Sequence, residues 1–181
     1  MKQFIILLFL SAAVLTGTAQ GPTGKPRLNI QLNAGGLLYT DIDEDFAYGG
    51  TVQFLIPISD KNLLTIGIKA MSNPFYGGKD FLATTNGFNK EGDALNYGLG
   101  LLGYRINIGD QQNGYLYVEP KAGVALSNSF NWVGFGMSPS FGFQMKTLDL
   151  MMFIDGGFGT KKLNTKRKSF VVPGIGVGFT F

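Results

Sequence analysis

Six ionisable side chains lie on the polar sides of strand-like segments, where they could act on protons or ions. Three are basic and three are acidic: Lys69, Arg105, Lys121, Glu119, Asp149 and Asp155. If these segments close into a narrow barrel, the six could line a polar pore or a proton path. They could also form interior ion pairs that hold the barrel's shape, because buried charges must be partnered. We favour ion pairs, since side chains fill a barrel of this width.

Enzyme chemistry is not indicated, because the chain contains neither histidine nor cysteine. The usual near-neutral general base is missing, and so is a thiolate nucleophile. A carboxylate pair could replace histidine, but no pattern places one beside an activated nucleophile. We therefore expect no catalytic residue, no metal site and no cofactor. The net charge of +3 is also too small to indicate a nucleic-acid partner.

The elements that position these residues are predicted strands, in which large apolar residues alternate with small or polar ones. In the last stretch, Phe170 to Phe181, large apolar residues alternate with positions that are mostly glycine. Successive strand side chains point to opposite faces, so such a segment has one apolar face and one nearly bare face. Eight runs of this kind are predicted: Arg27 to Tyr39, Phe46 to Ile58, Leu63 to Ser72, Ala94 to Ile108, Tyr115 to Leu126, Trp132 to Lys146, Leu148 to Phe158, and Phe170 to Phe181.

The fourth run breaks the alternation. Tyr97, Leu99 and Leu101 share one parity, whereas Leu102 and Tyr104 share the other. A β-bulge near Leu101 would add one residue and place both halves on the same face. We predict such a bulge, with every large apolar residue of this run facing outward.

The connections between the runs also form a pattern. Short turns alternate with longer connections, the longest being Asn73 to Asp93. Short periplasmic turns, longer external loops and an even number of strands are typical of outer-membrane barrels. The bulky face then points toward lipid, and the chain is closed because hydrocarbon tolerates no unpaired strand edge. A soluble lipocalin-like barrel, which would turn its bulky face inward to hold a ligand, is the alternative.

The amino-terminus carries an export signal. Lys2 precedes an apolar stretch from Phe4 to Leu15, and small residues at 17 and 19 precede a predicted cleavage after Ala19. The apolar stretch is shorter than the roughly 20 residues of a spanning helix. We predict a signal peptide over residues 1–19, a flexible leader over 20–26 and a barrel over 27–181.

The chain resembles the small eight-stranded outer-membrane barrels of the OmpX-like and OmpA-transmembrane-like group. The resemblance rests on the signal peptide, the eight alternating runs and the terminal pattern. The terminal pattern is Val177, Phe179 and Phe181. In that family, such an ending resembles the signal read by the barrel-assembly machinery. The resemblance implies an all-β, antiparallel, up-and-down transmembrane barrel in the outer membrane of a Gram-negative bacterium. We expect no peptidoglycan-binding domain after it.

Closure would place a basic connection beside an acidic one. The basic segment holds Lys161, Lys162, Lys166, Arg167 and Lys168, and residues 40–45 hold four acidic side chains. These charges could offset each other as exposed ion pairs of small value. Alternatively, the five cations contact phosphates of surface lipopolysaccharide.

Aromatic residues are expected to form interfacial girdles. The residues assigned to them are Tyr48, Trp132 and Phe158 at the outer rim, and Tyr104, Phe143, Phe179 and Phe181 at the inner rim. The sequence thus indicates a non-enzymatic barrel with a structural or adhesive role through its outer loops. A narrow channel for small solutes and an accessory part of an envelope assembly are the alternatives.

Overall fold

The computed structural model describes residues 24–36, 46–72, 96–109, 114–127, 132–159 and 169–181. These residues form ten strand segments. The segments are β1 (Arg27–Gly36), β2 (Phe46–Pro57), β3 (Asn62–Ser72), β4 (Tyr97–Ile108), β5 (Tyr115–Glu119), β6 (Lys121–Ser127), β7 (Trp132–Met137), β8 (Ser140–Met145), β9 (Leu148–Gly159) and β10 (Ser169–Thr180). None of the residues described forms a helix with the length and apolar character needed to cross a membrane. The predicted signal peptide lies outside this part of the chain.

The ten segments occupy eight strand positions, because two strands are interrupted at prolines. Pro120 separates β5 from β6, and Pro139 lies between β7 and β8. Proline has no backbone N–H to give to a ladder. The ladder nevertheless continues through the proline carbonyls, since Tyr104 N donates to Pro120 O (3.1 Å) and Ile154 N donates to Pro139 O (3.1 Å).

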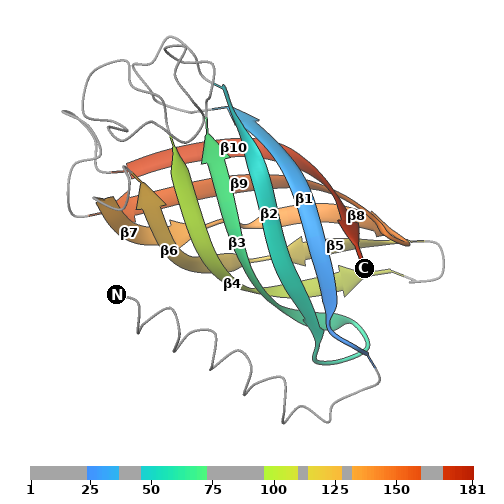
Figure 1. Cartoon of the computed structure of the whole chain (residues 1–181). Helices are drawn as coiled ribbons and strands as arrows, with labels where there is room; N and C mark the ends of the chain where they lie inside the picture. Colours follow the sequence, from blue (N-terminus) through green and yellow to red (C-terminus); the bar gives the residue numbers. More distant parts are fainter. Residues whose placement is uncertain (1–23, 37–45, 73–95, 110–113, 128–131, 160–168) are drawn as a thin grey trace.

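The sheet closes on itself. All neighbouring strands are antiparallel, and β1 pairs with β10 from Asn29 opposite Thr180 to Gly35 opposite Gly174. Figure 1 shows the first strand in blue beside the last in red. Closure leaves no sheet edge among these strands, as hydrocarbon requires. The prediction of a closed, eight-stranded antiparallel barrel is confirmed.

The two faces of the barrel are those that the alternation predicts. Leu32 and Ile68 point outward and are 71% and 67% exposed, whereas Gln31 and Gln53 are buried in the lumen. A soluble ligand-binding barrel would have the opposite arrangement, with its bulky side chains inside. The exposed apolar exterior instead suits contact with lipid.

The predicted bulge in β4 is wrong. The register between β3 and β4 runs without interruption from Asn62 opposite Ile106 to Met71 opposite Tyr97. Consequently Leu99 and Leu101 keep their parity and are buried in the lumen, while Leu102 points outward. No bulge is needed because one end of the lumen is apolar and accommodates these leucines.

The barrel has two different ends. At one end, which we call the turn end, tight connections join β2 to β3 and β8 to β9. Ile58 N donates to Asn62 O (2.9 Å) in the first of these turns, and Lys146 adopts a positive φ of 51° in the second. The opposite end, which we call the loop end, is where residues 37–45, 73–95, 128–131 and 160–168 connect the strands. In outer-membrane barrels the short turns face the periplasm.

Candidate functional site: a braced and plugged lumen

All six ionisable residues singled out from the sequence lie inside the barrel. Each is at least 94% buried, and they come from β3 (Lys69), β4 (Arg105), β5 (Glu119), β6 (Lys121) and β9 (Asp149 and Asp155). Burial of a charge is costly unless an opposite charge and hydrogen bonds compensate it. The lumen supplies both, and the six residues divide into two connected groups.

The first group is centred on Arg105, which is fully buried. Its Nε and Nη2 donate to Glu119 Oε2 at 3.0 and 2.8 Å, and Nη1 and Nη2 both lie 3.3 Å from Asp149 Oδ2. The guanidinium also lies 3.7 Å over the ring of Tyr117, and Nη1 donates to Gln144 Oε1 (3.1 Å). A planar fork of donors suits such a site better than a lysine ammonium would.

Asp149 is the most fully hydrogen-bonded acid of this group. Besides Arg105, its Oδ2 accepts from Asn29 Nδ2 (2.9 Å) and Gln31 Nε2 (3.4 Å), while its Oδ1 accepts from the Tyr117 hydroxyl (2.6 Å). These donors lie on β1 and β5, on either side of β9 in the barrel order. Asp149 therefore ties several strands together near the turn end.

The Glu119 carboxylate accepts fewer hydrogen bonds than the Asp149 carboxylate does. Lys121 Nζ lies 3.7 Å from Glu119 Oε1, which is too long for a hydrogen bond. In the part of the chain that the structure describes, Glu119 Oε1 and the nearby hydroxyls of Thr65 and Ser140 make no hydrogen bond. Among the described side chains, Arg105 therefore supplies the two close, charged hydrogen bonds that the Glu119 carboxylate accepts.

The second group is centred on Asp155, nearer the loop end. Lys69 Nζ lies 2.8 Å from Asp155 Oδ2. The hydroxyls of Tyr97 and Ser138 each donate to the same carboxylate at 2.6 Å. The Lys69 ammonium also lies 3.0 Å from the centre of the Phe153 ring, an attractive cation–π arrangement.

Sequence reasoning found the charged residues but missed the neutral partners that satisfy them. Tyr97, Tyr117, Ser138 and Gln144 all share the lumen parity of their strands. That parity was the available signal. What it could not supply was the register between strands, which decides which donor faces which carboxylate.

An aromatic cluster closes the lumen beyond Asp155. The rings of Tyr97 and Phe170 are 4.6 Å apart, and those of Trp132 and Phe170 are 5.9 Å apart. Leu99 and Met71 are buried in the same apolar core. We call these five residues the aromatic plug. It lies where β4, β7 and β10 reach the loop end.

Two glycines make room for the plug. A side chain at Gly157 would overlap the Phe170 ring, and one at Gly159 would overlap the Trp132 ring. Trp132 is only 1% exposed, so its assignment to an outer aromatic girdle is wrong: its parity points into the barrel. The remaining residues assigned to the girdles have at least part of their surface exposed: Tyr48, Tyr104, Phe143, Phe158, Phe179 and Phe181.

The lumen's chemistry is that of a braced core. Within the described residues its charges balance, three basic against three acidic. No group of acidic residues among them could hold a metal ion. The Ser138 hydroxyl donates a hydrogen bond to Asp155 (2.6 Å) and is 1% exposed, so it is not placed as an accessible nucleophile.

The remaining sequence-based predictions concern the ends of the barrel. The basic segment from Lys161 to Lys168 and the long connection Asn73 to Asp93 lie outside the described residues. Because β1 pairs with β10, the basic and acidic connections start from neighbouring strands, as predicted. Val177, Phe179 and Phe181 all point outward from the closing strand. Their role in assembly stays a prediction.

The closed barrel with an apolar exterior and a braced lumen defines the class: this chain has the fold of the small eight-stranded outer-membrane β-barrels. A solved member with this fold is Neisserial surface protein A (NspA), with a TM-score of 0.57 and 11% identity over 87% of this chain and 100% of that one. Ail, the attachment invasion locus protein of Yersinia pestis, matches with a TM-score of 0.49 and 11% identity over the same shares. No protein-family model and no curated protein matches the chain.

Proposed function

We propose that the chain is a non-enzymatic protein of the outer membrane of a Gram-negative bacterium, exported by its signal peptide. Its role is structural or adhesive and is exerted by the connections at the loop end. One observation carries this proposal: buried side chains occupy the lumen, as two groups of ion pairs and, at the loop end, as the aromatic plug. The surface that is left for recognition is the loop end itself.

A narrow channel receives less support from this geometry. Lys69 on β3 bonds to Asp155 on β9, and in an eight-stranded barrel β3 and β9 occupy opposite positions. The pair therefore crosses the lumen at its full width. We expect the purified barrel to show no salt-dependent conductance in planar bilayers. Stepwise conductance that scales with salt concentration would favour the channel.

The adhesive role is tested by replacing Asn73–Asp93 with a short Gly/Ser connection. Cells that make the variant should adhere less to a surface, and to one another, than cells that make the unchanged protein. The barrel itself should be unaffected, which is checked by faster gel migration of the unheated protein than of the boiled one. Equal adherence by folded wild-type and variant proteins would contradict the role of this connection. Recovery of a stable partner with the intact barrel would instead favour an accessory role in an envelope assembly.

Lipopolysaccharide is a proposed ligand of the basic segment. Its five cations follow β9 and precede β10, so they emerge at the end of the barrel where long connections face the cell exterior in this fold. Replacing all five with glutamine should weaken binding of purified lipopolysaccharide in vitro. The matched control replaces the four acidic residues of 40–45 with their amides, which should not weaken it. Unchanged binding after loss of the cations would rule the proposal out.

A further inference from the structure

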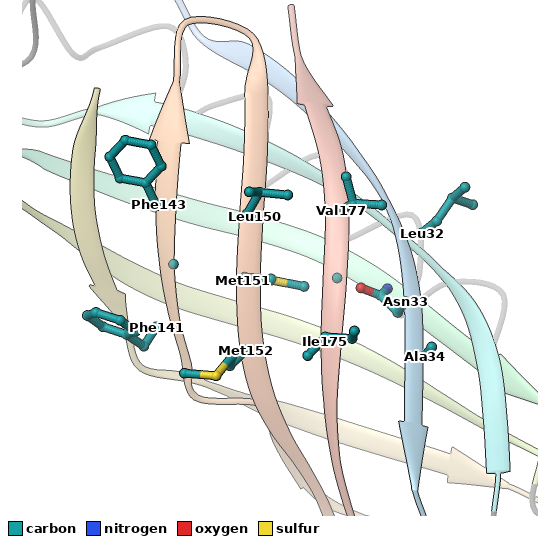
Figure 2. A pocket seen from close by; sticks show the side chains of 12 residues that line it. Leu32, Asn33, Ala34, Phe141, Phe143, Leu150, Met151, Met152, Ile175 and Val177 are labelled. Carbon is teal, nitrogen blue, oxygen red and sulfur yellow. The ribbon is translucent and has the colours of Figure 1, made fainter. Parts of the chain in front are cut away.

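The exterior of the barrel carries an apolar groove. It has a volume of about 510 Å³ and crosses four neighbouring strands, β8, β9, β10 and β1. Figure 2 shows two rows of outward side chains, one running from Phe143 to Leu32 and the other from Phe141 to Ala34. The floor between the rows is strand backbone, at residues such as Gly142 and Gly176 whose side-chain positions point into the lumen and not into the groove.

The groove lies on the face of the barrel that meets lipid, because its walls are outward residues of membrane-spanning strands. Leu32 and Ile175, on adjacent strands, are 71% and 64% exposed. Ala34, the smallest side chain of the walls, lies opposite Ile175 and keeps the groove open at β1. An extended hydrocarbon chain matches such a site in both chemistry and shape.

Charges at the turn end indicate which lipid the groove selects. Lys146 lies in the turn that joins β8 to β9, and Lys25 and Arg27 lie at the start of β1, so basic residues flank the four strands of the groove. Of the charged side chains described at this rim, four are basic (these three and Lys61) and one, Asp60, is acidic. A positive rim attracts an anionic headgroup.

The distance from the rim to the groove suits a single lipid molecule. Phe143 precedes Lys146 by three residues, which corresponds to about 10 Å along a strand. One leaflet of the hydrocarbon core is roughly 15 Å thick, half of the full core. An acyl chain whose headgroup lies at Lys146 therefore reaches the groove within its own leaflet.

We propose that this face holds one anionic glycerophospholipid, with an acyl chain in the groove between Phe143 and Ala34 and its phosphate at Lys146. Lys25 and Arg27 add to the positive field at the rim. The site belongs to the turn end, so it is separate from any recognition by the loop-end connections. It gives the barrel a preferred lipid neighbour on one side.

The test uses native mass spectrometry of the full chain, purified in detergent and mixed with equal amounts of phosphatidylglycerol and phosphatidylethanolamine. The unchanged protein should retain one phosphatidylglycerol in preference to phosphatidylethanolamine. Ala34→Phe should reduce its retention about tenfold, because the added ring displaces buried methylenes of the acyl chain. The control is Ala122→Phe, which adds the same ring to an outward position on β6, away from the groove. It should leave retention unchanged.

A second pair of variants tests the headgroup contact without altering the groove. Lys146→Asn removes the charge with a residue that tolerates a positive φ, and it should lower phosphatidylglycerol retention about fivefold, the effect of one basic residue near an anionic lipid. Lys146→Arg should preserve retention. Equal retention of the two lipids by the unchanged protein, retention of neither, or no effect of Ala34→Phe in a folded barrel would overturn the proposal.

Discussion

Replacing Arg105 with methionine should destabilise the barrel by about 3–5 kcal/mol, the usual cost of removing one partner from a buried ion pair. Arg105 makes two hydrogen bonds to Glu119 and two longer ones to Asp149. Methionine has a similar length and leaves the lumen packed, so the loss is chiefly electrostatic. The variant leaves two basic and three acidic groups among the six ionisable residues of the lumen.

The structure also identifies which carboxylate is left without compensation. Asp149 keeps the hydrogen bonds from Asn29, Gln31 and Tyr117 when Arg105 is removed. Among the described residues, Glu119 keeps the ammonium of Lys121, 3.7 Å away, and the neutral hydroxyl of Thr65 beside it. Adding Glu119→Gln to the Arg105→Met variant should therefore recover roughly 2 kcal/mol, within the range of coupling between contacting groups. Adding Asp149→Asn should recover much less.

The assay is urea unfolding in lipid vesicles, followed by fluorescence. Trp132 is the only tryptophan of the chain and is 1% exposed inside the barrel, so its emission reports loss of the lumen's packing. All variants should be compared under conditions in which unfolding and refolding curves coincide. A loss below about 1 kcal/mol for Arg105→Met, or equal rescue by the two second substitutions, would refute the assignment of Glu119 as the dependent partner.

Three further predictions follow from single positions. Trp132→Ala should cost about 3–5 kcal/mol in the same unfolding assay, because it empties part of the aromatic plug, and it should not produce conductance in planar bilayers, because the ion pairs still cross the lumen. Lys146→Gly should raise the free energy of unfolding by about 0.5–1 kcal/mol, because glycine adopts a φ of 51° without the strain that lysine bears. Phe181→Ala should reduce the amount of heat-modifiable barrel assembled in cells more than Ile175→Ala does, since both residues face lipid but only Phe181 ends the predicted assembly signal; equal reductions would contradict that role.

Much of this fold could be predicted from the sequence because a strand repeats every two residues. The alternation of Asn29, Gln31 and Asn33 with apolar residues predicts one buried and one exposed face, and the structure has both. The same parity places all six ionisable residues in the lumen. Closure by pairing of β1 with β10 follows from the needs of a membrane barrel rather than from any one residue.

The prediction was wrong where it assumed that every large apolar residue of the fourth run faces outward. That assumption required a bulge to turn Leu99 and Leu101 outward, although their parity already placed them inside. The aromatic plug explains their position, but its members Tyr97, Trp132 and Phe170 are distant in the sequence. Their proximity depends on the register of several strand pairs, which local alternation does not determine.

Register likewise determines the ion pairs, and their arrangement links stability to closure of the lumen. Lys69 reaches Asp155, and Arg105 reaches Asp149, so both bases on β3 and β4 bind acids on β9 across the barrel. The bonds that hold opposite strands together are therefore the same bonds that occupy the space through which a solute would pass. A substitution that opened the lumen would also remove partners from buried charges and destabilise the barrel. Selection for a stable barrel of this design thus acts against conduction, which agrees with the proposal that recognition belongs to the loop-end connections.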